Sequence, residues 1–248
     1  MPGDYFSAIA PAYARFRPHY PDALFAWLAG RAPARRLAWD CATGSGQAAV
    51  GLASRFKRVI ASDASAAQLS HAAPHPKVRY VRATAEHGVI RRGTVDLVCV
   101  AQALHWLDAP AFFAQAAEAL APHGVVAVWC YRLLEIEPDL DTAVQRFYHD
   151  VVGPFWPPER HHTEDGYRRT DFPFTEQAAP AFGITAELTL AELGGYLGTW
   201  SATARYREVN AQDPVPAFLD AVRPLWGAPE RRRMARWPLA LRVGTGPP

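Results

Sequence analysis

Runs of hydrophobic residues of strand length alternate with amphipathic segments over the first half of the chain. Five runs are expected to be strands buried on both faces of a parallel sheet: residues 36–41, 58–62, 78–83, 95–100 and 124–130. Three alanine- and leucine-rich segments between them predict helices: residues 46–56, 65–73 and 109–120. Strands that alternate with helices in this way indicate an α/β fold with a doubly wound sheet.

The second half of the chain departs from this rhythm at residues 131–180. This stretch is rich in proline and aromatic residues and too long for a plain connection, so we expect a lid that is mobile without ligand. After it, the pattern predicts helices at 190–200 and 214–226 and a closing strand at 237–243. A half-apolar chain of 248 residues can bury one sizeable core, and we expect one domain.

Charge and hydropathy narrow the classes of partner. The formal net charge is only +2, which gives no strong attraction to nucleic acid, and no nucleic-acid partner is expected. No stretch approaches the length of an apolar membrane span, so we expect a cytoplasmic protein without a membrane partner. One basic cluster is expected to coat a solvated helix end; its members are Arg231, Arg232, Arg233 and Arg236.

The cysteine and histidine spacings do not indicate a metal site. Cys41, Cys99 and Cys130 form no CxxC pair and lie at or near the ends of predicted strands, which predicts reduced, partly buried thiols. The histidines and carboxylates of residues 161–165 could suggest a metal. Adjacent histidines, however, point in different directions in most backbones. We interpret that segment as a polar loop and expect no metal.

The first predicted strand runs into a glycine turn in the stretch "LAWDCATGSGQAAV". Gly44 and Gly46 fit a dinucleotide-binding pattern, and Asp63 lies about 20 residues further on, where a ribose-binding carboxylate is expected. Asp40 argues against a dinucleotide, because a carboxylate beside the turn would repel a pyrophosphate. It suits S-adenosylmethionine, which carries an ammonium and a sulfonium and no phosphate. The glycines would let the backbone approach that ligand closely.

Several stretches, in this order, resemble the successive motifs of class I S-adenosylmethionine-dependent methyltransferases. They are "YARFRPHYP", "LAWDCATGSGQAA", "VIASDASAAQL", "VRYVRATAE" and "VDLVCVAQALHW". The chain is most similar to the small-molecule branch that includes trans-aconitate methyltransferase-like proteins. The stretches "GGYLGTWSA" and "WPLALRVG" extend the likeness over nearly the whole chain. One departure is Ala42, at a position where the family usually has glycine, and its single methyl group is expected to be a mild change.

The resemblance implies a Rossmann-like methyltransferase fold with a doubly wound, mostly parallel sheet of seven strands. It also implies how the single domain is divided: an N-terminal helical cap (1–35), a cofactor-binding core (36–130), a lid or acceptor insertion (131–180), and C-terminal helices with closing strands (181–248). The expected assembly is a monomer or a weak homodimer.

The resemblance further implies S-adenosylmethionine as cofactor and assigns roles to its ligands. Asp40 would act near the methionine ammonium through water or the turn amides, and Asp63 would hold the ribose hydroxyls. Glu86 would face the adenine, while Tyr13 and Arg17 would cover the cofactor, an arginine being suited to its carboxylate. The remaining expected ligands are Ala42, Gly44, Gly46, Ala64, Gln68, Ala85, Ala101 and Gln102.

Candidate acceptor-binding residues follow the fourth strand and lie in the predicted lid. Methyl transfer is an in-line displacement, so much of its acceleration comes from positioning. A carboxylate acceptor needs no base, whereas a hydroxyl does, and His105 is then the candidate catalytic group. Trp106 would form a pocket wall. The lid aromatics Tyr131, Trp156 and Tyr167 would exclude water from a small-molecule acceptor.

Each of these roles has a structural alternative. Asp63 could be a helix N-cap, Glu86 a solvated turn residue, Arg17 a loop brace and His105 a hydrogen-bonded structural histidine. Two other functions also stay open at this point. One is a non-catalytic S-adenosylmethionine-binding protein. The other is a nicotinamide-dependent reductase, although neither lysine of the chain lies four residues after a tyrosine, as a Tyr-x-x-x-Lys dyad would require.

Overall fold

The computed structural model describes residue 16 and residues 18–87 and 90–246 of the chain. The chain divides into two compact units. What we call the sheet unit contains residues 19–132 and 161–183 and the chain from 239 onward, and the helical unit contains residues 133–160 and 184–238 together with the first residues. The predicted lid, residues 131–180, is shared between the two units, and its closure over an acceptor stays a prediction.

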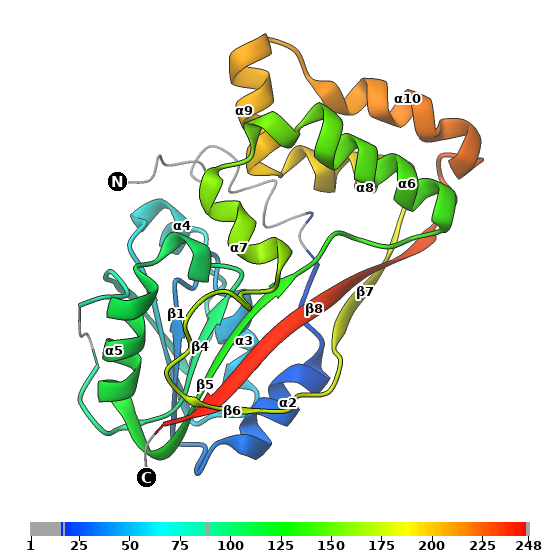
Figure 1. The fold of residues 1–248 in the computed structure, drawn as a ribbon. Coiled ribbons are helices and arrows are strands. Elements are labelled where there is room, and N and C mark those ends of the chain that lie inside the picture. Colours follow the sequence, from blue (N-terminus) through cyan, green and yellow to red (C-terminus); the bar gives the residue numbers. More distant parts are fainter. Residues whose placement is uncertain (1–15, 17, 88–89, 247–248) are drawn as a thin grey trace. The chain divides into compact units, whose positions relative to one another are not determined.

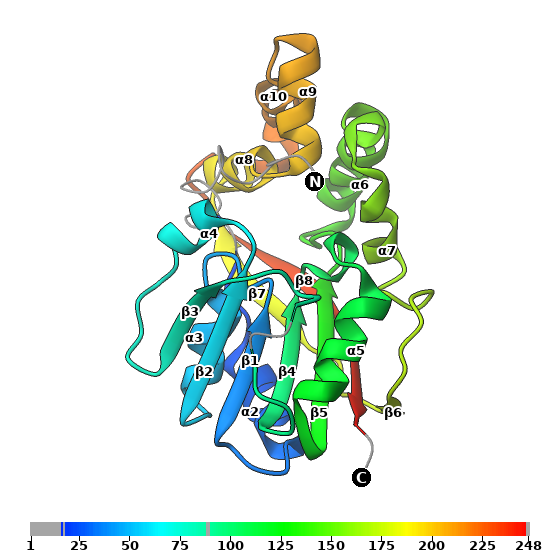
Figure 2. The same ribbon diagram turned by 90° about the vertical axis from the view of Figure 1, so that its left-hand side faces the viewer.

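The described chain forms one eight-stranded sheet, in the order β3-β2-β1-β4-β5-β8-β6, with β7 paired to β8 off this path. The parallel strands are β1 (Leu37–Cys41), β2 (Arg58–Asp63), β3 (Val78–Arg82), β4 (Val95–Ala101) and β5 (Leu120–Tyr131), which Figure 2 shows side by side. β8 (Arg233–Thr245) runs antiparallel to β5 and to β6 (Thr175–Gln177), and β7 (Gly183–Leu188) pairs with β8. The predicted doubly wound α/β fold is confirmed, and β7 is the strand beyond the expected seven.

The strand order places a topological switch point beside β1. The chain runs outward from β1 to β2 and β3, and then returns so that β4 pairs with the other side of β1. In this register Asp40 lies between Ala61 and Cys99. Ligands of doubly wound sheets bind beyond the carboxyl ends of the strands at such a point, so the turn after β1 is the first place to look for a site.

Helices cover both faces of the parallel strands, as the alternation of buried residues requires. On one face, α2 (Asp22–Arg31) and α3 (Gln47–Ala53) pack in a core cluster with Ala38 and Leu97 of the sheet. On the opposite face, α5 (Ala109–Ala119) packs with Trp39 and Val98 (Figure 2). Helix α2, which falls in the expected N-terminal cap, is therefore part of the sheet unit's core. The short α4 (Ala66–Ser70) follows β2.

The helical unit is built from two stretches of the chain, residues 133–160 and 184–238, which Figure 1 draws in green and in yellow to red. Its helices are α6 (Pro138–Arg146), the π-helical η2 (Phe147–Val151), the short η3 (Gly153–Phe155) and η4 (Pro158–Arg160), α8 (Leu190–Gly198), α9 (Ser201–Asn210) and α10 (Pro214–Trp226). Aromatic side chains pack against one another between them: the ring centroids of Phe147 and Phe218 are 4.9 Å apart, and those of Tyr196 and Trp237 are 5.3 Å apart. As the bounds of α6, η2, η3 and η4 show, residues 135–160 of the predicted lid are mostly helical.

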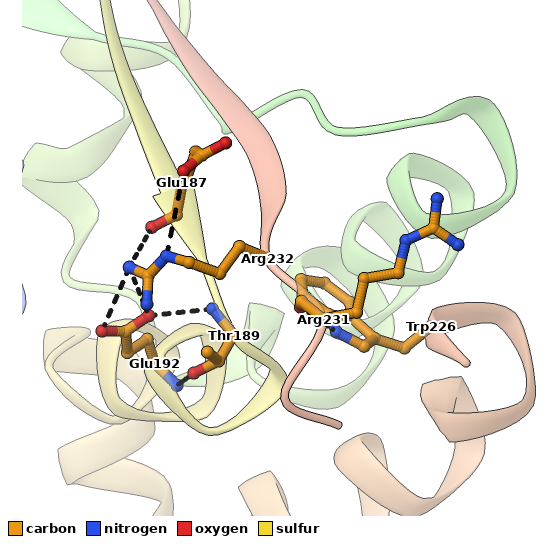
Figure 3. A network of polar contacts seen from close by, with 6 residues as sticks. All are labelled: Glu187, Thr189, Glu192, Trp226, Arg231 and Arg232. Atoms are coloured by element: carbon orange, nitrogen blue, oxygen red, sulfur yellow. Dashed lines mark hydrogen bonds and ion pairs between the residues drawn. The ribbon is translucent and has the colours of Figure 1, made fainter. Parts of the chain in front are cut away.

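The predicted basic cluster lies around the start of β8, and Arg232, Arg233 and Arg236 of it pair with carboxylates of the helical unit. Arg232 Nη2 lies 3.1 Å from Glu192 Oε2 and its Nε lies 3.9 Å from Glu187 Oε2 (Figure 3). Glu192 also closes a capping box with Thr189 at the start of α8. Arg233 is buried, pairs with Glu137 and donates to the carbonyls that end α10. Arg231, Arg232 and Arg236 are exposed, as a solvated cluster requires, and the expectation was wrong only for Arg233, which stabilises the junction of α10 and β8.

The three cysteines are free thiols. They are fully buried in the sheet unit, and so lie deeper than the partial burial that the sequence predicts. Among the helices of the described residues, none has the length and apolarity needed to cross a membrane.

Candidate active site

The turn between β1 and α3 is held in a left-handed backbone conformation at three positions. Ala42, Gly44 and Gly46 have φ angles of +54°, +56° and +83°. The amide of Thr43 donates to the carbonyl of Ser62 at 2.9 Å, which ties the turn to the end of β2. The amide of Gly44 donates to Asp63 Oδ2 at 2.8 Å and that of Gly46 to the Thr43 carbonyl at 3.0 Å. These bonds hold the turn in place at the strand ends, where ligands of such sheets bind.

Alanine at position 42, in place of the family's usual glycine, costs more free energy than the sequence suggests. An L-residue with a Cβ in the left-handed region costs about 1–2 kcal/mol relative to glycine, and Ala42 has that conformation. The methyl group itself packs against the core cluster on the α5 face. The expectation that the alanine adds only a methyl group was therefore wrong about the backbone, which carries local strain.

Gly46 is required for a reason that the sequence did not reveal. A Cβ at this position would lie 2.2 Å from the hydroxyl oxygen of Tyr80, a residue of β3. At Gly44, a Cβ would meet only Gln68 Oε1 at 3.7 Å, an ordinary contact. Tyr80 donates to the carbonyl of Ala73 at 2.7 Å, and partial burial raises its pKa, as does the negative charge of Asp40. The tyrosine, which sequence reasoning missed, thus forms part of the wall of this turn.

Asp40 is completely buried at the end of β1. The hydroxyl of Thr43 donates to its Oδ2, and the thiol of Cys99 donates to its Oδ1 at 3.3 Å. Burial raises the pKa of Asp40 to about 6, although these hydrogen bonds and the amide of Ala49 act in the opposite direction. Asp40 therefore stabilises the turn by its hydrogen bond with Thr43. Because Asp40 is completely buried, its predicted effect on a methionine ammonium would be indirect, through the residues of the turn.

Asp63 joins the two turns at the carboxyl ends of β1 and β2. Its Oδ2 accepts from the amide of Gly44 and its Oδ1 from the amide of Ser65, both at 2.8 Å. Burial raises its pKa, and the two amides oppose that shift. The N-cap of α4 is Ser65, whose side chain accepts from Gln68 N, so the N-cap alternative for Asp63 was wrong. Each carboxylate oxygen can accept a second hydrogen bond, as a ribose hydroxyl would require.

The other expected ligands on this side also lie near the strand ends. Ala64 is exposed, and Gln68 is buried with its side chain beside Gly44. Ala85 is buried after β3, and Glu86 accepts from the amide of Asp108 at 3.3 Å. Glu86 therefore has a contact at the start of α5, and its predicted role toward adenine stays a prediction.

The residue that follows β4 is held by two hydrogen bonds to β5. Gln102 follows Ala101, the last residue of β4, and has a φ of +58°. Its amide donates to the carbonyl of Trp129 at 2.7 Å, and its side-chain Oε1 accepts from the amide of Tyr131 at 2.8 Å. These two bonds fix the direction of the chain as it enters the short helix η1 (Leu104–Trp106).

His105 and Trp106 lie in η1, and their ring centroids are 4.7 Å apart. His105 is 8% exposed, and its Nδ1 is hydrogen-bonded to the hydroxyl of Tyr167 at 3.1 Å. Tyr167 is fully buried. The sequence predicts that both residues line an acceptor pocket, and the structure brings them into contact although 62 positions separate them.

The remaining predicted acceptor and lid residues belong to different units. Tyr131 is buried at the end of β5 in the sheet unit, whereas Trp156 belongs to the helical unit and donates to the carbonyl of Tyr148 at 3.3 Å. Tyr13 and Arg17 lie outside the described residues. Their roles stay predictions.

The segment 161–165 is not a polar loop, as the sequence suggested, but contains the helix α7 (His161–Glu164). Its His161 Nδ1 lies 3.5 Å from Glu164 Oε2. Within residue 16, residues 18–87 and residues 90–246, no three histidine, cysteine or acidic side chains group in a way that could hold a metal.

The composition of the site fits a ligand with positive charge. Segments 40–46 and 63–68 contain two carboxylates and no basic residue. Asp63 accepts from the amide of Gly44 in the turn, and Asp40 accepts from the hydroxyl of Thr43 and the amide of Ala49. A pyrophosphate would meet these negative charges without a compensating cation, whereas S-adenosylmethionine brings its own.

Comparison with known proteins agrees with this chemistry. A family model described as a methyltransferase domain matches residues 39–128. A protein of Dictyostelium discoideum that is named as a methyltransferase is 32% identical over 223 residues, which cover 88% of this chain and 85% of that protein.

Solved structures show the same likeness. A structure from Anaeromyxobacter dehalogenans, described as a type II methyltransferase, is 44% identical, with a TM-score of 0.89 over 94% of this chain and 100% of that one. A phosphoethanolamine N-methyltransferase of Haemonchus contortus, solved with S-adenosylhomocysteine, shares the fold at 16% identity, with a TM-score of 0.51 over 99% of this chain and 58% of that one. The chain therefore belongs to the class I S-adenosylmethionine-dependent methyltransferases, and S-adenosylmethionine is its cofactor.

Proposed function

We propose that the enzyme methylates an oxygen atom of a small-molecule acceptor, either a carboxylate or a hydroxyl. The observation that carries the proposal is the hydrogen bond between two buried residues, His105 in η1 after β4 and Tyr167 after α7, in the same unit as the glycine turn. An imidazole at this edge of the sheet can accept a proton from a hydroxyl or donate a hydrogen bond to a carboxylate. The likeness to the small-molecule branch that includes trans-aconitate methyltransferase-like proteins supports the same class of acceptor.

In this reaction the cofactor supplies an electrophilic methyl group on its sulfonium. We assign the ribose hydroxyls to Asp63, because each of its oxygens already accepts one backbone amide and keeps the capacity for a second bond. The turn from Ala42 to Gly46 would take the methionine part, with Asp40 beneath it. Ala85 and Glu86 would lie toward the adenine, and Gln102 would close over the methionine with its backbone.

The role of His105 depends on the acceptor. A hydroxyl acceptor loses its proton as the methyl group is transferred, and a positioned base contributes to the rate. A carboxylate acceptor is already a nucleophile, and the imidazole would then orient one of its oxygens. Trp106 would form an apolar wall beside the imidazole in either case.

A screen of carboxylic acids, phenols, alcohols and amines for release of S-adenosylhomocysteine would identify the acceptor. Turnover of amines alone would contradict the proposed oxygen acceptor. With an acceptor in hand, His105→Gln distinguishes the two roles. If His105 is a base, kcat falls about 100-fold or more and the acidic limb of the pH–rate profile disappears. If it orients a carboxylate, KM rises and the limb stays.

The control is His149→Gln, because His149 is exposed and lies in the helical unit. Its kcat and KM should match those of the wild type. An unchanged kcat and KM in His105→Gln itself would show that His105 is a structural histidine and would remove it from the site. The nicotinamide-dependent reductase is set aside, because the chain belongs to a methyltransferase family.

A further inference from the structure

Arg242 of β8 makes an unusually complete set of contacts with one loop of the sheet unit. Its Nη1 donates to the carbonyls of Tyr167 and Thr170, both at 2.7 Å. Its Nε and Nη2 donate to the two carboxylate oxygens of Glu176 at 3.0 and 3.1 Å. The guanidinium carbon lies 4.6 Å from the ring centroid of Phe172. One side chain thus holds residues 167–176 at four points.

The backbone at Tyr167 is itself constrained. Gly166 and Tyr167 have φ angles of +68° and +64°, and the second is unfavourable for a residue with a side chain. Together they end α7 with paired bonds from Tyr167 N to the His162 carbonyl at 2.8 Å and from Gly166 N to the Thr163 carbonyl at 3.2 Å, the pattern of a Schellman motif. A Cβ at Gly166 would lie 2.5 Å from the Cβ of Ala240, so the turn is packed directly onto β8.

The side chain of Tyr167, in this constrained turn, contacts the imidazole of His105. The hydroxyl of the fully buried Tyr167 is hydrogen-bonded to His105 Nδ1. Arg242 donates to the backbone carbonyl of Tyr167, and the side-chain hydroxyl of Tyr167 is hydrogen-bonded to His105, so Tyr167 links β8 to η1. Strained backbone that surrounding contacts hold in place is found preferentially at functional sites.

We propose that Tyr167 and Arg242 are positioning residues for His105. This inference rests on the proposed function, because it assigns the two residues to the acceptor side of that site. Tyr167 acts on the imidazole directly, and Arg242 acts through Tyr167. The sequence prediction that Tyr167 lines the acceptor pocket is replaced by a role one step behind the imidazole.

The phenol is suited to this task because its hydroxyl can both donate and accept. Its oxygen accepts from Nδ1–H when the imidazole is protonated or carries its only proton on Nδ1, and its hydroxyl donates to Nδ1 of the other neutral tautomer. The ring can thus keep one orientation in both protonation states. A base role for His105 requires the tautomer with its proton on Nδ1, because a proton taken from the acceptor would then go to Nε2.

The first test is Tyr167→Phe, which removes one hydroxyl and keeps the ring. We expect the ¹⁵N chemical shifts of the His105 imidazole to change, because the tautomer and ring orientation lose their fixed partner. We also expect kcat to fall about 10- to 100-fold, the range for misplacing a catalytic group, with unchanged affinity for S-adenosylhomocysteine. The control is Tyr206→Phe in α9 of the helical unit, which should change neither quantity.

The second test is Arg242→Gln, compared with Arg232→Gln. Arg232 is also paired with carboxylates but lies in the helical unit. The first variant should shift the same His105 resonances in the same direction as Tyr167→Phe, and the second should not. Should Arg242→Gln fail to fold, Glu176→Gln weakens the same arginine from its exposed side and should give a smaller shift of the same sign.

The outcomes separate this inference from the proposed function. Changed His105 resonances and a lower kcat in Tyr167→Phe support the positioning role. Unchanged His105 resonances in Tyr167→Phe would overturn it, whatever the acceptor proves to be. The imidazole spectrum is recorded on the protein without substrate, so it reports on positioning even if the enzyme methylates a different class of acceptor.

Discussion

The two halves of the site at the edge of the sheet are built in different ways. On the side of β1 and β2, Asp40, the glycine turn and Asp63 are joined by hydrogen bonds between residues about 20 positions apart or fewer, and most of them involve the backbone. On the side of β4 and β5, His105, Tyr167 and Arg242 are joined by bonds that span 62 and 75 positions. The side assigned to the cofactor is held mostly by neighbouring segments, although Cys99, 59 positions away, also donates to Asp40, whereas the side assigned to the acceptor is joined by contacts between distant segments alone.

This difference has a physical reason. A cofactor shared by a whole family can be held by turns whose shape follows from a few glycines and carboxylates. An acceptor pocket must vary between enzymes, and side chains from distant elements can be exchanged without changing the turns. The predictions below test whether the cofactor side is as tightly built as its contacts indicate.

The largest expected effect is the contribution of Asp40 to the pH dependence of the free energy of unfolding. Its pKa is raised to about 6 by burial, above the value of about 4 in an unfolded chain. The folded state therefore binds more protons between these pH values, and the free energy of unfolding falls by about 3 kcal/mol as pH rises from about 4 to 6. Denaturant unfolding from pH 4 to 8 should show this component in the wild type and not in Asp40→Asn.

The control for Asp40 is Asp139→Asn, which changes an exposed carboxylate of α6. It should keep the pH dependence of the wild type. Parallel curves for the wild type and Asp40→Asn would contradict the account of a buried, ionisable carboxylate beneath the turn.

The next effect concerns the fit of Gly46 against Tyr80. Gly46→Ala combines a left-handed backbone with a Cβ that would lie 2.2 Å from the tyrosine hydroxyl oxygen, and it should lower the free energy of unfolding by about 2 kcal/mol. Gly93→Ala is the matched control, because Gly93 has a φ of +67° and nothing within 4 Å of its added Cβ. Gly93→Ala should cost about 1 kcal/mol. Equal losses in both variants would show that Tyr80 does not constrain the turn.

The smallest expected effect is an increase in the free energy of unfolding, in the variant Ala42→Gly. Ala42→Gly relieves a left-handed φ of +54° and should raise the free energy of unfolding by about 1 kcal/mol. Ala38→Gly on β1, which is extended and buried, should instead lower it. A loss of stability in Ala42→Gly would mean that the packing of its methyl group outweighs the backbone strain.

The sequence was informative where structure is local. Strands β1 to β4 and helix α10 follow from short hydrophobic patterns with nearby turn signals, and their observed bounds lie within one residue of the predicted ones. The reduced thiols follow from spacing alone. The turn after β1 was identified from Gly44 and Gly46, because glycine is the residue that left-handed turns require.

The sequence was less informative where contacts are distant. Tyr80 lies against Gly46 only because β3 pairs with β2 in a register that places Tyr80 beside Ala61, and no local pattern contains that information. Two signals were present and could have been used. Gly166 follows a short polar run and ends α7, as a C-terminal cap glycine does. Arg242 interrupts an apolar strand, and a charge in such a place is normally paired.

The most direct test of the central claim is calorimetry of S-adenosylhomocysteine binding to the wild type and to Asp63→Ala. The account predicts binding to the wild type, no binding of NAD, and a loss of about 1.5–3 kcal/mol in Asp63→Ala, the range for a hydrogen bond to a charged group. Asp213→Ala is the control, because Asp213 caps α10 in the helical unit, and its affinity should equal that of the wild type. Equal affinity of Asp63→Ala and the wild type, or binding of NAD without S-adenosylhomocysteine, would contradict the account.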